Sequence, residues 1–174
     1  MEVHQRQFPV QNFRLDHMHH IHPQLVKGHW ACKVDLKDAY FHIGVHPDLR
    51  PFLRHRVRNQ VWEYQAGPFG LNIMPQLFQK VMGTFERKWH LKGIQAFIYL
   101  DDILVLASTK LLLQKHMAVV VRDLMDSGFK INQKKSALEP SQLVQHLGFL
   151  LNFLEGKLQL VPQKMKGVRR ELGK

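Results

Sequence analysis

The chain has 174 residues, of which 45% are hydrophobic and 22% are charged, a composition that excludes a disordered protein and suits one domain with a hydrophobic core. Its single cysteine, Cys32, excludes an internal disulfide and fits a reducing, intracellular compartment, and no apolar run is long enough to cross a membrane. The formal net charge of +11 favours nucleic acid as a partner over a merely basic, solvated surface.

The first half of the chain contains a predicted strand and a predicted hairpin. Residues 1–30 are polar and rich in His, and the apolar pattern then predicts a strand over residues 31–36. Residues 52–58 and 61–65 predict two further strands, joined by a tight turn at Asn59-Gln60.

A predicted helix and a second hairpin follow. Pro75 suits the first turn of a helix with one apolar face, and Gly93 suits its end. Residues 95–100 and 103–108 are predicted to be buried strands on either side of Asp101-Asp102.

The remaining residues are predicted to form a second helix and more strands. Ser108 or Thr109 can cap this helix, and Gly128 suits its end. The later strands are expected at residues 129–131, 143–151 and 157–161. Apart from the first hairpin, the order is strand, helix, strand, strand, helix, strand. This order predicts an α+β fold, the split βαβ arrangement, with helices on one face of an antiparallel sheet and the other face open for a ligand.

Asp101 and Asp102 interrupt a run of residues that is otherwise typical of a buried strand pair. Burying two adjacent carboxylates is unfavourable, so we expect a hairpin whose tip carries both of them out of the core. The alternative is that the two aspartates only make the turn, since Asp favours turns. The absence of Gly, which normally accompanies a two-residue hairpin turn, weakens that alternative.

A second acidic site, Asp35 with Asp38, follows the first predicted strand. In the split βαβ order this strand and the Asp-Asp hairpin are neighbours, so Asp35 is expected to approach Asp101. Three converging carboxylates need cations, and hard divalent ions prefer oxygen ligands. Two such ions support in-line phosphoryl transfer, which makes a two-metal nucleotidyl transfer site the leading hypothesis.

Five segments of the chain, in order within residues 30–161, resemble the conserved motifs of reverse transcriptases. They are residues 34–43, residues 67–71 followed by Pro75, Phe78 and Gln79, the Tyr-x-Asp-Asp box at 99–102, residues 128–135, and residues 146–149. The sequences of these motifs are most similar to those of retrotransposon enzymes of the tyrosine-recombinase (DIRS) type, with the Ty3/gypsy type second. Hepadnavirus-like polymerases share some of these residues. The resemblance implies the palm of an RNA-directed DNA polymerase.

The resemblance assigns the catalytic roles to four residues. Asp35 and Asp101 would be the main metal ligands and Asp102 would assist them, with two Mg²⁺ ions, or Mn²⁺, as the cofactor. Lys135 matches the basic residue that would protonate the leaving diphosphate. The alternative for Lys135 is an ordinary solvated lysine.

The resemblance also assigns residues to the nucleotide and the primer. Tyr40 would lie against the sugar 2′ position, Phe69 and Gly70 would line the nucleotide pocket, and Gln79 belongs to the same nucleotide-binding set. Gly148 would let the primer backbone approach closely. For Tyr40 the alternative is core packing, because Tyr is commonly part-buried.

Three positions depart from the family pattern. Gly67 stands where Leu is usual, Gly44 where Pro is usual, and Met74 where a small residue is usual. The bulk of Met74 is expected to crowd the nucleotide pocket.

The domain prediction has three parts. Residues 1–30 are expected to be a truncated fingers-side segment, 31–161 the palm with a fingers hairpin at about 50–66, and 162–174 the start of a truncated thumb connection. The fingers, thumb and ribonuclease H regions of a parent polyprotein are expected to be missing, so processive synthesis is not expected of this chain alone. The expected partners are an RNA or DNA template with its primer and deoxynucleoside triphosphates, and no membrane.

Two alternative functions and one alternative site stay open. The chain could be an inactive retroelement remnant that binds nucleic acid, or the palm of an RNA-dependent RNA polymerase, against which Tyr40 argues. The cluster of His17, His19, His20 and His22 invites a zinc interpretation. We do not favour zinc, because structural zinc sites usually combine Cys with His at defined spacings.

Overall fold

The computed structural model describes residues 21–161, and within that range it contains two α-helices and nine strands. The helices are α3 (Met74–Leu91) and α4 (Lys110–Asp126). The strands are β1 (Trp30–Asp35), β2 (Arg54–Val57), β3 (Gln60–Glu63), β4 (Gln95–Tyr99), β5 (Asp102–Ala107), β6 (Ala137–Ser141), β7 (Leu143–His146), β8 (Phe149–Asn152) and β9 (Lys157–Leu160). Short 3₁₀ helices span His22–Gln24, Ala39–His42 and Pro47–Leu53.

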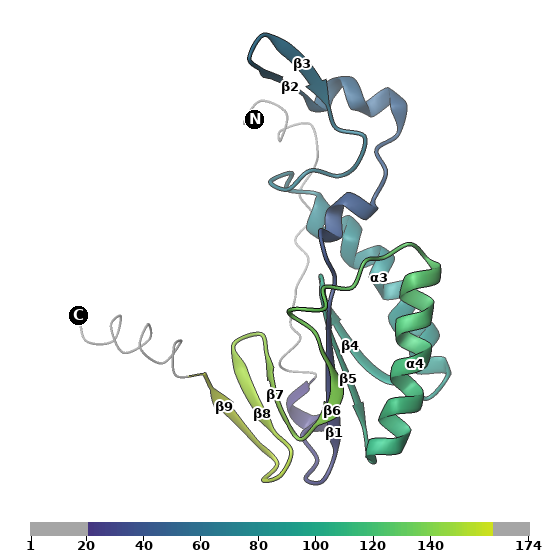
Figure 1. Cartoon of the computed structure of the whole chain (residues 1–174), viewed down its shortest axis with the longest axis vertical. Coiled ribbons are helices and arrows are strands. Elements are labelled where there is room, and N and C mark those ends of the chain that lie inside the picture. The colour runs from purple at the N-terminus through teal and green to yellow at the C-terminus, as the bar shows by residue number, and fades with distance from the viewer. Residues whose placement is uncertain (1–20, 162–174) are drawn as a thin grey trace, which may run out of the picture.

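The central sheet has the strand order β4-β5-β1-β6 and is antiparallel throughout. Both helices cover the same face of this sheet (Figure 1). Fully buried Phe78 and Trp89 from α3 pack there with Ile98, Val105 and Leu124. The predicted α+β fold, with an antiparallel sheet and helices on one face, is confirmed.

The two helices begin and end where local sequence signals predict. Pro75 lies in the first turn of α3, and Gly93 just beyond its end has a φ of +73°. The Thr109 side chain caps α4 by accepting a hydrogen bond from Leu112 N at 3.2 Å. Neither helix of residues 21–161 has an apolar stretch that could cross a bilayer.

The second face of the sheet is only partly open, which corrects the prediction of a free face. The three-stranded sheet β7-β8-β9 packs against one end of it. Leu104 and Leu106 of β5 are buried there together with Ile21, Leu151 and Phe153. Among residues 21–161, the three-stranded sheet leaves the other end of β1 and β5 uncovered, and the register places Asp35 and Asp102 at that end, where Asp35 is 6% exposed.

Two strand predictions after α4 are wrong in their bounds. Residues 129–131 do not form a strand, and only Ile131 makes an isolated bridge, to Leu36. The fourth strand is instead β6, an edge strand that accommodates Pro140 because an edge residue need not donate to the ladder. The predicted strand 143–151 is divided into β7 and β8 by a turn at Leu147-Gly148, where both φ values are positive.

The β2–β3 hairpin forms a separate two-stranded sheet whose residues are all exposed, at the top of Figure 1. Its turn is at Arg58-Asn59 rather than at the predicted Asn59-Gln60. Both turn residues have positive φ values, of 45° and 64°, as a type I′ hairpin turn requires.

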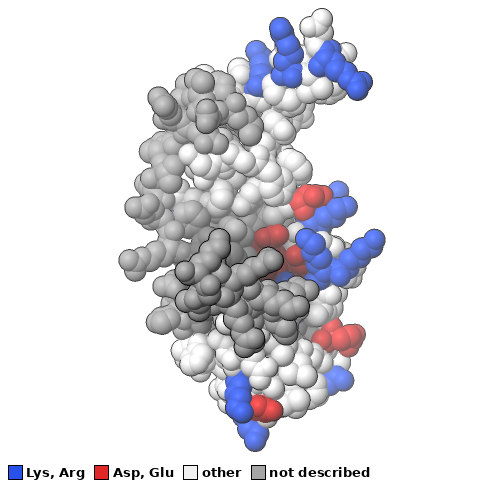
Figure 2. Space-filling model, turned by 90° about the vertical axis from the view of Figure 1, so that its left-hand side faces the viewer, with Lys and Arg blue, Asp and Glu red and all other residues white. Residues whose placement is uncertain are grey.

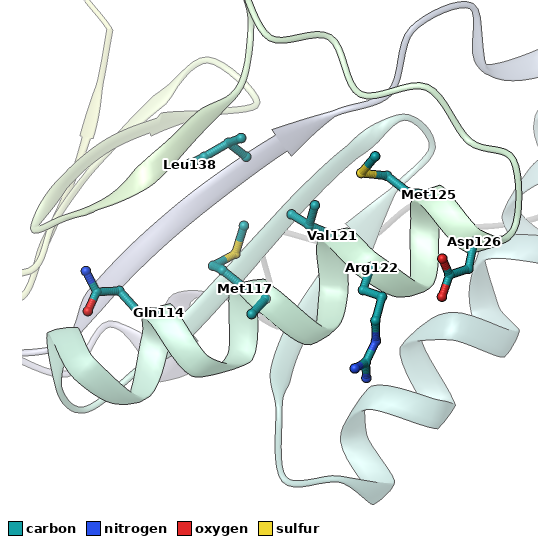
Figure 3. A pocket seen from close by; sticks show the side chains of 8 residues that line it. Gln114, Met117, Val121, Arg122, Met125, Asp126 and Leu138 are labelled. Carbon is teal, nitrogen blue, oxygen red and sulfur yellow. The ribbon is translucent and has the colours of Figure 1, made fainter.

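A groove of about 520 Å³ lies between α4 and Leu138 of β6 (Figure 3). Because it is on the helix-covered side, the sheet separates it from the acidic residues of the opposite face. Its lining residues are Gln114, Met117, Ala118, Val121, Arg122, Met125, Asp126 and Leu138.

A buried carboxylate joins the two helices. Asp123 of α4 is 8% exposed and accepts a hydrogen bond from Trp89 Nε1 at 3.0 Å. Lys88 Nζ lies 3.1 Å and Lys92 Nζ 3.9 Å from the same carboxylate. Burial alone would raise the pKa of Asp123, but the hydrogen bonds from Lys88 and Trp89 outweigh it and hold the pKa below the usual value.

We expect Asp123→Ala to lower the free energy of unfolding by about 2 kcal/mol, because the Trp89 indole N–H would be buried without an acceptor. Asp123→Asn keeps an acceptor and should lose less. The remaining difference between Asn and wild type is the contribution of charge. Because the folded pKa is depressed, that contribution is complete above the unfolded pKa of about 3.9 and is lost as the pH falls through the folded pKa. Urea unfolding at several pH values measures both effects, and equal losses for the two variants would contradict this role.

Candidate active site

Three aspartates gather where β1 ends and β5 begins. The antiparallel register places Asp35 directly opposite Asp102, and Val34 opposite Ile103. Val34 and Ile103 belong to the core under the helices, so strand alternation directs Asp35 and Asp102 to the other face. Figure 2 shows acidic side chains together in the middle of the molecule, with Lys and Arg beside them.

The tip of the β4–β5 hairpin is Leu100-Asp101, not the predicted pair Asp101-Asp102. Tyr99 pairs with Asp102, which places Asp102 inside the strand and Asp101 in the turn. Leu100 has a φ of +54°, so positive φ falls on the first turn residue alone, a place where type II′ turns normally have Gly. A left-handed conformation costs a non-Gly residue about 1–2 kcal/mol. Such strain in a turn that holds Asp101 is typical of a functional site.

The three carboxylates act on one another electrostatically. Burial raises the pKa of Asp101 above its usual value, and the charges of Asp102 and Asp35 raise it further. Its own backbone N–H and the positive charge of Lys135 act in the opposite direction. The site therefore carries unfavourable negative charge that a cation would relieve.

Lys33 is a site residue that the sequence analysis missed. Its Nζ lies 2.8 Å from Asp102 Oδ1, and both side chains are about four-fifths buried, with exposures of 18% and 21%. Lys33 is two residues before Asp35 on the same strand, so alternation alone could have placed it beside the acidic cluster. Within residues 21–161, no three His, Cys, Asp or Glu side chains already stand where they would enclose a metal ion. An ion held by all three aspartates would compete with Lys33 for the Asp102 carboxylate.

The loop after α4 fixes the backbone of Asp35. Asn132 N donates to Asp35 O at 2.8 Å, and Asp35 N donates to Ser136 Oγ at 3.0 Å. This loop carries Lys135, which is exposed and close enough for its charge to act on Asp101. The structure thus brings the predicted residues Asp35, Asp101 and Lys135 together.

Tyr40 lies next to the acidic cluster and in contact with Phe69. Their ring centroids are 4.9 Å apart, and the Phe78 ring stands edge-on to Tyr40 at 5.7 Å. Burial raises the pKa of Tyr40, and the charge of Asp101 adds to this. Phe69 is 54% exposed and the next residue, Gly70, is also exposed. Tyr40 and Phe69 therefore form an accessible aromatic wall beside the carboxylates.

The Met74 side chain was expected to crowd the nucleotide pocket, but it is buried against Gly67 instead. Met74 is 3% exposed and lies against Gly67, where a Cβ would be only 2.6 Å from Met74 Sδ and 3.1 Å from Tyr40 O. The large residue at 74 occupies the space that the missing side chain at 67 leaves. The two departures from the family pattern therefore compensate each other, and Met74 is buried against Gly67.

Other predicted residues are apart from this cluster or have other partners. Both ends of the Gln79 amide bond the backbone of the β4–β5 hairpin. Gly148, with a φ of +80°, lies in the β7–β8 turn. Of the four clustered histidines only His22 is described, and it is exposed; the others, like the predicted segment 162–174, lie outside the described residues.

Comparisons with known proteins agree on one family. The model of the family described as "Reverse transcriptase (RNA-dependent DNA polymerase)" matches residues 1–151. The genome polyprotein of Petunia vein clearing virus is 29% identical over 135 residues, which are 76% of this chain and 6% of that protein. The retrovirus-related Pol polyprotein from transposon gypsy of Drosophila melanogaster is 23% identical over 145 residues, 83% of this chain and 14% of that protein.

A solved structure shares the fold. The foamy viral protease-reverse transcriptase in complex with dsDNA matches with a TM-score of 0.78 and 21% identity, over 94% of this chain and 33% of that chain. The chain thus spans a small part of the curated relatives and a third of this structural neighbour.

We expect Asp101→Asn to stabilise the fold at neutral pH by about 1 kcal/mol, because it removes unfavourable charge from a functional site. The folded pKa of Asp101 is raised, so the native state binds the proton more tightly than the unfolded chain does. The advantage of the variant should therefore shrink as the pH falls through that pKa. Thermal unfolding against pH measures it, with exposed Asp126→Asn as the control. A variant less stable than wild type at pH 7 would contradict mutual repulsion among the carboxylates.

We expect Gly67→Ala to lower the free energy of unfolding by about 1–3 kcal/mol, because its Cβ would overlap Met74. In the Met74→Ala background the same change should cost about 1 kcal/mol less, since the space is then free. Gly83→Ala, in the middle of α3 with nothing within 4 Å of the added Cβ, is the matched control and should stabilise the helix. Additive effects of the 67 and 74 substitutions in chemical denaturation would rule out the compensation.

Proposed function

The chain belongs to the reverse transcriptase (RNA-dependent DNA polymerase) family, and we propose that it forms the catalytic palm of an enzyme that copies a nucleic-acid template into DNA. Relatives include retrotransposon and viral polyproteins, so the predicted kinship with gypsy elements is confirmed. Kinship with the DIRS type stays a prediction. The parent polyprotein, with fingers, thumb and ribonuclease H regions, is part of the proposal.

The proposal is supported by the positions of Asp35 and Asp102, which face each other across β1 and β5, and of Asp101 in the adjoining turn, close enough for their charges to act on it. Their oxygen donors suit Mg²⁺ or Mn²⁺. Burial raises the pKa of Asp101 most, the charges of Asp102 and Asp35 raise it further, and bound cations would offset both effects. Asp35 and Asp101 would be the principal ligands, and Asp102 would assist them while Lys33 competes for its charge. When bound, two such ions would lower the barrier of phosphoryl transfer by stabilising charge on the attacking and leaving oxygens.

The remaining site residues position the substrates. Tyr40 and Phe69 offer an aromatic surface for the sugar and base of an incoming deoxynucleoside triphosphate, and Gly70 leaves room beside them. Lys135 would donate a proton to the leaving diphosphate, and its charge acting on Asp101 supports this role. Gly148 lies in a tight turn, where the lack of a side chain would admit the primer backbone.

The proposed macromolecular partner is a primer paired with an RNA or DNA template. The net charge of +11 suits a polyanion, and foamy viral protease-reverse transcriptase has been solved with double-stranded DNA and with an RNA/DNA hybrid. The exposed hairpin adds basic charge through Arg56 and Arg58, while Arg54 is paired with Glu63 at 3.0 Å. Binding through phosphates should fall steeply with salt concentration.

The direct test is addition of one deoxynucleotide to a primer–template by excess chain with Mg²⁺ or Mn²⁺. We expect slow, metal-dependent addition that Asp35→Asn and Asp101→Asn reduce by at least about 10³-fold, the scale of losing a principal electrostatic contribution. Asp126→Asn, remote from the cluster, is the control. Salt-sensitive binding of the primer–template without any addition would instead support the alternative, an inactive remnant that binds nucleic acid.

The choice of sugar tests Tyr40. Its ring should exclude a 2′-hydroxyl, because discrimination here works by a clash against the wrong substrate. Tyr40→Val should raise the kcat/KM ratio of ribonucleotide to deoxyribonucleotide by roughly tenfold or more, since about 1.4 kcal/mol of lost clash gives a factor of ten. The measurement requires this chain within an enzyme that extends primers. An unchanged ratio would show that Tyr40 only packs in the core, and it would favour the RNA polymerase alternative.

A further inference from the structure

Gln79 links helix α3 to the hairpin that carries Asp101. Its Nε2 donates to Ile98 O at 3.0 Å, and its Oε1 accepts from Leu100 N at 3.0 Å. The two partners fix the orientation of the amide, because a backbone N–H can only donate and a carbonyl can only accept. Both polar groups of this side chain are therefore engaged on the hairpin backbone rather than directed at a nucleotide.

The residue that Gln79 holds is the strained one. Leu100 has a φ of +54°, a region that costs a Leu side chain free energy and that Gly would occupy without cost. On the other side of the turn, Asp101 O accepts from Leu36 N at 2.9 Å. The peptide units on both sides of the turn are thus held, one by α3 and the other by the end of β1.

We infer that Gln79 is a positioning residue that keeps the Leu100-Asp101 turn in its left-handed form and so aims the Asp101 carboxylate at Asp35 and Asp102. The inference rests on the proposed function only in treating this cluster as an ion site. Without the bond to Gln79, Leu100 relaxes towards negative φ and Asp101, the next residue, turns away from the other two carboxylates.

The competing explanation is that Gln79 merely ties α3 to β4. The two explanations differ in what a glycine at position 100 does. Leu100→Gly removes the strain that calls for a clamp, but it restores no hydrogen bond between Gln79 and Ile98. Adding Leu100→Gly to Gln79→Met should therefore restore Mn²⁺ binding only if Gln79 positions the turn.

The experiment uses the 174-residue chain and the variants Gln79→Met, Leu100→Gly and the double variant. Met has nearly the length of Gln and lacks its hydrogen bonds, so no large cavity is made. Lys80→Ala, on the next and exposed residue of α3, is the matched control. The first readout is hydrogen exchange of the Leu100 amide by NMR, and the second is the dissociation constant of Mn²⁺ from water-proton relaxation. Neither readout requires polymerase activity.

We expect Gln79→Met to accelerate exchange of the Leu100 amide about tenfold, as loss of one hydrogen bond implies. It should weaken Mn²⁺ binding by roughly tenfold, the lower end of the loss seen when a group supporting a metal ligand is removed. The double variant should bind Mn²⁺ within about threefold of Leu100→Gly alone, and Lys80→Ala should match wild type.

Several results would overturn the inference. Unchanged Leu100 exchange in Gln79→Met would show that the clamp does not exist. If Gln79→Met weakened Mn²⁺ binding and Leu100→Gly failed to restore it, Gln79 would only connect α3 to β4. If the wild-type chain bound no Mn²⁺, the proposed function would fail, while the exchange data would still report separately on the clamp. A variant that does not fold is recognised by its lost amide spectrum, and the Leu100→Gly single variant then provides the test. If Gln79 clamps a strained turn, Leu100→Gly should raise the stability of the fold and keep the Mn²⁺ affinity. A loss of stability or of Mn²⁺ affinity in this variant would refute the inference.

Discussion

The site depends on one constraint, the register of β1 against β5, which places the Asp35 carboxylate opposite Asp102 on the same face of a buried sheet. Two carboxylates at that spacing repel, and Asp101 at the adjoining turn adds a third charge. The chain keeps this unfavourable arrangement because apolar residues on the other face of the same strands hold the register. A slip by one residue would exchange the two faces and bury the acids under the helices.

The rest of the structure supports that arrangement from several sides. Lys33 neutralises part of the charge on Asp102, and the loop after α4 bonds the Asp35 backbone through Asn132 and Ser136. Helix α3 holds the turn that carries Asp101 through the hydrogen bond between Gln79 and Leu100 N. The two helices are themselves joined by the hydrogen bond between Trp89 and Asp123. The acidic cluster is thus held by neighbours from strand, loop and helix, as preorganised electrostatic catalysis requires.

Much of this could be predicted from the sequence because it rests on local signals. Alternation and caps predicted the element order, and the two aspartates interrupting an apolar run indicated the site before any geometry was known. Which residues occupy the turn could not be predicted, because a Leu at positive φ contradicts local preference and is imposed by tertiary contacts. Strand β6 was missed since it contains Pro and lacks a clear apolar alternation. The compensation between Gly67 and Met74 could not be predicted from the sequence, because it depends on the two residues being in contact in the folded chain.

We propose that Asp35, Asp101 and Asp102 together form a divalent-ion site where β1 ends and β5 begins. Paramagnetic broadening of amide NMR signals by substoichiometric Mn²⁺ tests it most directly, because the effect falls steeply with distance from the ion. We expect broadening centred on these three residues and extending to Lys33 and Tyr40. Excess Mg²⁺ should abolish it, and Asp35→Asn should greatly reduce it. Broadening centred on Asp123 and Asp126, or spread evenly over exposed carboxylates, would contradict it.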